Sequence, residues 1–428
     1  MKTKGTGRRD KVGERRAFTV ESLLPTGDGG VGRVRIAGAF PSEGVIAQID
    51  HVGKHATFAT AVEVTRTHPG RRLPPCRRHR DMTGGRCAGC ALMALGEGDQ
   101  RSELRRMLKE QHGLEVDEVI AAPLQLGYRW SAKRIAFGGP GNLRLGSFMR
   151  GTHRPADMAG CLVDHPKISE AADELADVAR EMGIGAHNDD RKLFGLRAVW
   201  FRTNGEQVLA TLISSEADDS EMRRLSPRLT RCDGVAVSLH RGEGNRLHGT
   251  SATVLRGLEE LDVHGTPIGP LGFLQPNPEV AELMYDHLID DITGGRVLDL
   301  YAGSGATTRR LTALGAEVVP SESHPEAAAT LSVQAETVEA FLAQQSERPA
   351  VVVANPPRRG LGRAVTNELL RLSPERIHVR ACGPASLATD IKALEAAYEL
   401  TSLRAYDTLP QTPHVELVAK LVLRTVSG

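Results

Sequence analysis

The sequence has no long hydrophobic run, and this absence excludes several classes of protein. No apolar stretch in its 428 residues approaches the length of a membrane span. The first residues also lack the apolar core of a secretory signal peptide. Internal repeats and long low-complexity tracts are missing too, and 25% of the residues are charged, as in ordinary globular proteins. We therefore expect a soluble, cytoplasmic protein of two or three domains with no membrane partner.

Negative charge is scarce in the first part of the chain. Residues 1–160 contain 27 Lys and Arg against 16 Asp and Glu, whereas residues 161–428 contain 27 against 37. The net charge of +1 therefore hides an excess of +11 in the first part and −10 in the second. This asymmetry predicts a polyanion-binding module joined to a second unit. A basic, solvated surface would give the same counts and is the alternative interpretation.

Disulfide bonds are not expected among the six cysteines, because the reducing conditions of the cytosol keep thiols reduced. Cys76, Cys87 and Cys90 are clustered, and Cys161 lies further along the chain. Soft thiolates that include one C-x-x-C pair suit zinc or an iron–sulfur cluster. Zinc ribbons usually contain two such pairs, so this set fits a 4Fe–4S cluster better. Unliganded thiols are the alternative, mainly for Cys161 and Cys232.

After a basic tail at residues 1–15, short β-type runs alternate with Gly and Pro. Several short strands in this space predict a small barrel of OB type over residues 16–75. Such barrels often bind oligonucleotides, so we expect this domain to contact a nucleic acid. The β-type runs lie at residues 18–20, 32–36, 44–49 and 60–64.

Regular alternation of strands and helices in residues 266–428 predicts a Rossmann-like α/β domain, a parallel sheet with helices on both faces. Residues 76–265, between the barrel and this domain, mix strands and helices around the cysteine cluster and form the expected central α+β domain. In the last domain, strands are predicted at 296–301, 316–320, 350–354 and 377–380, and helices at 278–292, 306–314 and 325–345.

A strand that runs into a glycine turn indicates a nucleotide-like cofactor pocket. Gly303 and Gly305 follow the strand ending at Tyr301, and they let the backbone turn tightly and approach a ligand. The third glycine of a dinucleotide fingerprint is absent because Thr308 stands there, which argues against NAD. Glu322, just past the next strand, can accept hydrogen bonds from ribose hydroxyls. A purely structural glycine turn is the alternative.

Polar residues further along complete the predicted site. Asn355 precedes two prolines at the end of a strand, a rigid position from which its amide could contact a cofactor or a base. Cys382 also follows a strand, and nearby Arg380 favours its thiolate form. A thiol, the Glu416 carboxylate and a nucleotide pocket together suit methylation of a carbon that is not nucleophilic alone, such as pyrimidine C5. A buried core cysteine is the alternative for Cys382.

These motifs resemble the RNA uridine C5-methyltransferase family, in particular the branch with an N-terminal TRAM domain and an iron–sulfur cluster, typified by 23S rRNA uracil-5 methyltransferases. The resemblance spans nearly the whole chain. Residues 16–75 look like a TRAM domain, and Cys87 to Cys90 is similar to the family's Cys-Gly-Gly-Cys. Residues 127–133 resemble its Tyr-Arg-Asn-Lys segment. Residues 273–277 are similar to Phe-Phe-Gln-x-Asn, and residues 410–416 match Pro-Gln-Thr-x-His-Val-Glu closely.

The resemblance implies a class I methyltransferase domain behind a TRAM barrel and an iron–sulfur domain, with a role for each matching position. Cys382 would be the nucleophile that adds to uracil C6, and Glu416 the base that removes the C5 proton. S-adenosylmethionine would be held by Gln275, Tyr301, Gly303, Glu322 and Asn355, and a 4Fe–4S cluster by Cys76, Cys87, Cys90 and Cys161.

Some positions depart from the family pattern: Asn355 replaces an Asp, Ala306 an Asn that helps to bind the cofactor, and Gly383 an Asn. These changes bear on cofactor affinity and leave the nucleophile and the base in place. The resemblance thus implies a monomeric enzyme that methylates uridine C5 in RNA, with 23S rRNA as the expected substrate and tRNA as the alternative. A non-catalytic RNA-binding protein that keeps the fold is one rival. The other is an enzyme that methylates a free nucleotide or a protein.

Overall fold

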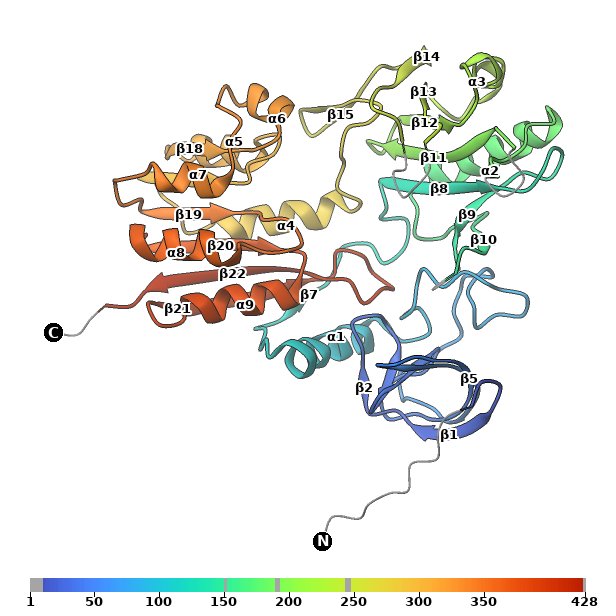
Figure 1. The fold of residues 1–428 in the computed structure, drawn as a ribbon, viewed down its shortest axis with the longest axis horizontal. Coiled ribbons are helices and arrows are strands. Elements are labelled where there is room, and N and C mark those ends of the chain that lie inside the picture. Colours follow the sequence, from blue (N-terminus) through green and yellow to red (C-terminus); the bar gives the residue numbers. More distant parts are fainter. Residues whose placement is uncertain (1–10, 150–151, 189–192, 243–247, 426–428) are drawn as a thin grey trace, which may run out of the picture.

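A computed structural model describes residues 11–149, 152–188, 193–242 and 248–425 (Figure 1). Most of the basic tail predicted at residues 1–15 therefore lies outside the described residues. Three larger sheets occupy separate parts of the molecule, and helix α1 (Glu97–His112) lies between the N-terminal sheet and the C-terminal one. None of the helices in the described ranges combines the length and apolar content needed to cross a bilayer.

The N-terminal sheet has six strands in the order β1-β5-β6-β4-β3-β2. Alternate residues of β5 are buried, among them Val45, Ala47 and Ile49, and they form one hydrophobic core with Ile36 of β4. Burial of every second residue is typical of a β-strand, and it explains why the sequence pattern predicted short strands here. The strands are β1 (Arg15–Thr19), β2 (Ser22–Leu23), β3 (Gly29–Val31), β4 (Val34–Ala37), β5 (Gly44–Val52) and β6 (Thr57–Arg66).

The central sheet has seven strands in the order β10-β9-β8-β11-β12-β13-β14, all antiparallel except the β12–β13 pair. Helix α2 (Pro166–Glu181) covers it, and its Leu175 and Ala179 share a core with Val199 and Phe201. The strands are β8 (Ser131–Phe137), β9 (Arg144–Phe148), β10 (Pro155–Asp157), β11 (Leu196–Thr203), β12 (Val208–Ser214), β13 (Gly234–Leu239) and β14 (Thr253–Gly257).

The C-terminal sheet has the order β18-β17-β19-β20-β22-β21-β7. Its first four strands are parallel, as predicted, but β22 runs antiparallel to both β20 and β21. The upstream strand β7 (Val119–Ile120) completes the sheet beside β21. The other strands are β17 (Arg296–Leu300), β18 (Glu317–Ser321), β19 (Val351–Ala354), β20 (Arg376–Ala381), β21 (Tyr398–Tyr406) and β22 (Glu416–Leu423).

Helices cover both faces of this sheet. Helix α4 (Pro278–Ile289) packs on the face that carries Val351, Val353 and Val418. The opposite face, with Ile377, Val379 and other apolar residues, packs against helices from upstream and downstream in the chain. Those helices are α1, α7 (Val338–Ala343), α8 (Gly362–Leu372) and α9 (Pro384–Leu394).

The helix predicted over residues 325–345 is wrong as a single element. The structure has α6 (Pro325–Thr330) and α7 instead. Ser332 adopts a left-handed conformation (φ 56°), and Ala335 forms an isolated β-bridge with Glu322. Thr337 then caps the new helix by accepting a hydrogen bond from the Ala340 N–H (3.3 Å). The break thus brings the chain back beside the end of β18.

Candidate functional site

The carboxyl ends of the four parallel strands bring several predicted site residues to one edge of the C-terminal sheet. Tyr301 follows β17, Glu322 follows β18, Asn355 follows β19 and Cys382 follows β20. Parallel strands end at a common edge, and open α/β sheets bind ligands there. Asn355 is exposed at this edge, and its N–H donates to the Leu300 carbonyl (3.2 Å).

The glycine turn after β17 has the shape that close approach of a ligand requires. Tyr301, Gly303 and Gly305 have φ of 59°, 56° and 80°, the region that favours glycine. A Cβ added to Gly303 would meet nothing within 4 Å, so no neighbouring atom requires glycine here by close packing, and the space beside its Cα is open. Gly305 is different, because a Cβ there would lie 2.5 Å from the Leu331 side chain. Helix α5 (Ala306–Ala313) begins here without a side-chain cap.

Glu322 is fixed by backbone donors on two segments. Its Oε2 accepts a hydrogen bond from the Gly303 N–H (2.8 Å), and its Oε1 accepts from the N–H groups of Ser323 (2.8 Å) and His324 (2.7 Å). The carboxylate therefore joins the end of β18 to the glycine turn. A carboxylate held in this way can still accept hydrogen bonds from a ribose through its remaining lone pairs.

Two buried acids support this edge, and the sequence did not predict a role for either. Asp299 accepts a hydrogen bond from the Thr308 hydroxyl (2.6 Å), and burial raises the pKa of its carboxyl to about 7. Asp390 of α9 accepts from the N–H groups of Leu361 (2.8 Å) and Gly362 (3.1 Å), and burial raises its pKa as well. Asp390 thus ties the helix after Cys382 to the loop that follows Asn355.

Gln275 is the predicted cofactor residue that the structure does not connect to the others. It lies in the segment that leads into α4, which Asn277 caps by accepting from the Val280 N–H (3.4 Å). Within the described ranges, Gln275 makes no hydrogen bond to the residues at the ends of β17, β18 and β19. Its assignment therefore stays a prediction.

Cys382 and Glu416 lie at matching ends of neighbouring antiparallel strands. Arg380 pairs with Val418, and Ala381 pairs with Leu417 as the last pair of this register. Cys382 comes directly after Ala381 and Glu416 directly before Leu417, so both residues stand next to the last pair of the two strands. Cys382 is exposed, which excludes the alternative that it is a buried core cysteine.

The sequence suggested Arg380 as a partner of the Cys382 thiolate, but the structure shows its side chain in contact with Glu416. The Arg380 side chain is buried, and its Nε (2.9 Å) and Nη2 (2.8 Å) both contact Oε2 of Glu416. Its guanidinium also lies over the ring of Tyr285 on α4, 5.1 Å from the centroid. Burial alone would lower the pKa of Arg380, but the Glu416 carboxylate and Tyr285 raise it above its usual value.

The segment before Glu416 is held by residues from the upstream part of the chain. Nε2 of Gln100 on α1 donates to Oε1 of Gln411 (2.8 Å), and the Gln411 backbone N–H donates to Oε1 of Gln100 (3.2 Å). Gln411 also donates to the carbonyl of Gln125 (3.2 Å), and the Tyr128 hydroxyl donates to the carbonyl of Pro410 (3.0 Å). These contacts fix the approach to β22 from outside the C-terminal sheet.

The predicted cluster cysteines gather in one region. Cys76, Cys90 and Cys161 pack around one small hydrophobic cluster of Met93, Tyr128 and Val163. Burial raises the pKa of the Cys87 thiol and raises that of Cys90 to about 12, and the neighbouring thiols add to both shifts. Even so, no group of three or more His, Cys, Asp or Glu in the described residues is arranged to hold a metal ion.

Cys232 lies apart from that region, in the core of the central sheet with Leu229 and Val235. Burial raises the pKa of its thiol to about 12. This placement agrees with the interpretation of Cys232 as an unliganded thiol.

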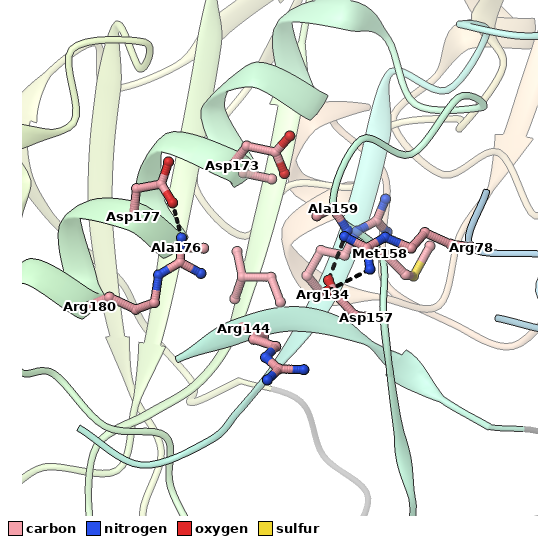
Figure 2. A pocket seen from close by; sticks show the side chains of 12 residues that line it. Arg78, Arg134, Arg144, Asp157, Met158, Ala159, Asp173, Ala176, Asp177 and Arg180 are labelled. Carbon is pink, nitrogen blue, oxygen red and sulfur yellow. Dashed lines mark hydrogen bonds and ion pairs between the residues drawn. The ribbon is translucent and has the colours of Figure 1, made fainter. Parts of the chain in front are cut away.

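A polar cavity of about 330 Å³ lies beside α2, away from the C-terminal sheet (Figure 2). Arg78 pairs with Asp157 (3.2 Å) and Arg180 pairs with Asp177, so both guanidinium groups already have carboxylate partners. The cavity therefore offers little uncompensated charge to a ligand. Charged residues dominate its lining, which includes Arg78, Arg134, Arg144, Arg180, Asp157, Asp173 and Asp177.

The glycine turn, the fixed acid and the partly parallel sheet define an α/β domain of the class that binds nucleotide-like cofactors. No family model matches the sequence. The chain is 30% identical over 427 residues to an uncharacterized RNA methyltransferase from Geobacter sulfurreducens, and the match covers 91% of this chain and 85% of that protein. It is 26% identical over 447 residues to an uncharacterized RNA methyltransferase from Halalkalibacterium halodurans, covering 95% and 96%.

The chain therefore belongs to the RNA methyltransferase family. Among solved structures, it is similar to the tRNA (uracil-54, C5)-methyltransferase of Pyrococcus abyssi in complex with S-adenosyl-L-homocysteine. The TM-score is 0.76 at 24% identity, and the match covers 95% of this chain and 99% of that one. At this identity the similarity shows a shared fold over almost the whole chain.

Proposed function

We propose that this protein is an S-adenosylmethionine-dependent RNA methyltransferase that methylates uridine at C5 through a covalent intermediate. The observation that supports this most is that β20 and β22 pair as far as Ala381 and Leu417, so Cys382 and Glu416 stand next to that last pair, at adjoining strand ends. The glycine turn and Glu322 lie at the same edge of the sheet. A nucleophile, a base and a cofactor site at one edge support this reaction better than binding alone.

The reaction follows from the chemistry of the two side chains. The Cys382 thiolate bonds to uracil C6, which makes C5 nucleophilic. C5 then attacks the methyl carbon that S-adenosylmethionine would supply, the bond between this carbon and the sulfonium sulfur breaks, and S-adenosylhomocysteine leaves. Glu416 then removes the C5 proton, the C5–C6 double bond forms again, and the C6–S bond breaks to return the thiolate. The target base must leave its stack to reach the exposed Cys382.

The residues at the sheet edge fit S-adenosylmethionine. The open space at Gly303 admits a ligand close to the backbone, and α5 begins there without a side-chain cap on its first N–H groups. Glu322 would accept hydrogen bonds from the ribose hydroxyls, and Tyr301 and Asn355 would flank the cofactor. Asn355 carries no charge, so an ionic contact with a cofactor ammonium is excluded there.

Glu322→Gln should weaken S-adenosylmethionine binding by about tenfold or more, because a hydrogen bond to a charged group contributes roughly 1.5–3 kcal/mol. The amide would also point an NH₂ group at backbone donors that now share the carboxylate. Calorimetric titration with S-adenosylhomocysteine measures the change. Glu326→Gln, on the nearby α6, is the matched control and should bind as the wild type does. Equal affinity in all three proteins would contradict the ribose role.

The cysteine set supports, as a second part of the proposal, a 4Fe–4S cluster bound by Cys76, Cys87, Cys90 and Cys161. Four thiols around one region supply the donor chemistry that such a cluster requires. The buried guanidinium groups of Arg129 and Arg134 are close enough to interact with these thiols and would offset the negative charge of the thiolates. Binding would require a different arrangement of the thiols, because no three metal-ligating side chains in the described residues are arranged to hold a metal ion.

Cys90→Ser should abolish iron binding, whereas Cys232→Ser should keep it, because Cys232 lies in the core of another sheet. Iron, sulfide and zinc content after anaerobic purification, with the visible absorption spectrum, provides the measurement. Four irons per chain in the wild type and in Cys232→Ser are the expected result. Zinc without iron in the wild type, or full iron in Cys90→Ser, would contradict the cluster.

The substrate proposed is 23S rRNA, with tRNA, the RNA named for the similar Pyrococcus abyssi enzyme, as the alternative. Methyl transfer from labelled S-adenosylmethionine to unmodified 23S rRNA and to unmodified tRNA tests the whole proposal. Transfer to uracil C5 in either RNA supports the reaction, and the RNA that accepts it identifies the substrate class. RNA binding without transfer by the wild type would favour the non-catalytic alternative.

A further inference from the structure

Arg380 lies near the end of β20, two residues before the proposed nucleophile Cys382. Successive side chains in a strand alternate between faces, and Arg380 lies on the face that α4 covers, whereas Cys382 follows the last residue of β20. On the neighbouring strand, Glu416 and Val418 share that same face, and Val418 packs with residues of α4. Arg380 pairs with Val418, which makes Glu416 its diagonal neighbour. A long side chain can span the roughly 7–8 Å of such a diagonal.

The guanidinium of Arg380 is fixed on both sides. It lies over the ring of Tyr285 on α4, and Nε and Nη2 contact a single oxygen of Glu416, Oε2, at 2.9 and 2.8 Å. The Arg380 side chain is 1% exposed, whereas that of Glu416 is 20% exposed. The buried end of this pair therefore holds the partly open end in place. Oε1 of Glu416 is left as the oxygen that can take a proton.

We propose that Arg380 is a positioning residue for Glu416, and that it presents this carboxylate to the C5 proton of the uridine adduct. This inference rests on the proposed function. Arg380 acts through Glu416 and touches neither the RNA base nor the methyl donor in this role. Without the guanidinium, the Glu416 side chain is free to take other rotamers, and fewer of them aim an oxygen at the proton.

The step that depends on Arg380 comes late in the reaction. Addition of the Cys382 thiolate to C6 and transfer of the methyl group to C5 precede proton removal. If Glu416 is misplaced, the C5 proton stays, the C6–S bond cannot break, and the methylated RNA remains bonded to Cys382. Loss of Arg380 therefore traps a methylated covalent adduct. A purely structural loss would instead lower adduct formation and turnover together.

The test compares Arg380→Met, Arg380→Lys and the control Arg376→Met with the wild type. Methionine keeps an unbranched apolar side chain beside Tyr285, and lysine keeps the charge but not the two-nitrogen contact. Arg376 starts the same strand and pairs with Asp291 instead. RNA and methyl-labelled S-adenosylmethionine are mixed with each enzyme, and the SDS-resistant labelled protein–RNA complex and the free methylated RNA are followed over time.

We expect Arg380→Met to lower turnover by about ten- to a hundredfold, a part of the roughly 10²–10⁴-fold that a general base supplies. Labelled adduct should accumulate to near one per enzyme, with unchanged RNA affinity. Arg380→Lys should fall between this variant and the wild type, and Arg376→Met should match the wild type. Because Arg380→Lys keeps the buried charge, it stays a test even if Arg380→Met fails to fold.

Two results would overturn the inference without touching the proposed function. One is wild-type turnover in both Arg380 variants. The other is a parallel fall of adduct and turnover in the folded Arg380→Lys protein. A wild type that transfers no methyl group to uracil C5 would instead contradict the proposed function itself.

Discussion

Cys382→Ala should abolish methyl transfer to RNA, with a loss of roughly four to six orders of magnitude in turnover, the scale seen when a covalent nucleophile is removed. Without the thiolate, nothing adds to uracil C6, and C5 does not become nucleophilic. The loss should also remove any SDS-resistant protein–RNA complex. Methyl transfer from labelled S-adenosylmethionine, at saturating RNA, provides the measurement.

The position of Cys382 makes this experiment easy to interpret. Its side chain is exposed at the end of β20, so alanine leaves no cavity in the core, and stability should change by less than about 0.5 kcal/mol. Binding of S-adenosylhomocysteine and of RNA should also stay as in the wild type. Cys232→Ala is a poor control because Cys232 is buried, and Glu399→Gln on the exposed side of β21 serves better. Residual transfer above about 1% of wild type would show that Cys382 is not the nucleophile.

Local patterns in the sequence were enough to predict much of the sheet edge that carries the candidate site. The glycine turn after Tyr301 and the acid at Glu322 are signals within one β-α-β unit, and the structure joins them by the Gly303 N–H. The exposed end of β20 could likewise be predicted from a strand followed by Gly383 and Pro384. Such signals need only the backbone preferences of nearby residues.

Contacts between segments far apart in the chain could not be predicted from the sequence. The parallel-sheet prediction missed the antiparallel β21–β22 hairpin, because strand direction depends on pairing rather than on composition. It also missed β7, an upstream strand of two residues at the far edge of the sheet. Gln100 holds the loop at Gln411 across most of the chain, and no pattern in either segment indicates that contact.

Arg380 is an example of what the sequence could and could not predict. Its proximity in sequence to Cys382 suggested a thiolate partner, but the side chain points to Glu416. The alternation of side chains along β20 puts Arg380 on the face opposite to that of Val379 and Ala381, which the sequence alone could show. Choosing between partners on that face required the register with β22, which is a property of the fold.

Glu416→Gln should lower turnover by about 10²–10⁴-fold while leaving methyl transfer within the first catalytic cycle in place. The amide cannot accept the C5 proton, so the methylated RNA should stay bonded to Cys382. The gel assay with labelled S-adenosylmethionine should then show a protein–RNA complex that carries one methyl label per enzyme. Glutamine keeps an oxygen that can still accept from Nε and Nη2 of Arg380, so the side-chain contacts between β20 and β22 persist.

The label on the trapped complex decides the role of Glu416. A complex that contains the methyl group places Glu416 after methyl transfer, as a base for C5 must be. A complex without the label would place Glu416 before the transfer and would contradict that assignment. Glu399→Gln, also on a strand of this sheet, controls for the loss of one carboxylate and should turn over normally. A Cys382→Ala/Glu416→Gln double variant should form no complex, because the bond that Glu416 helps to break is then never made.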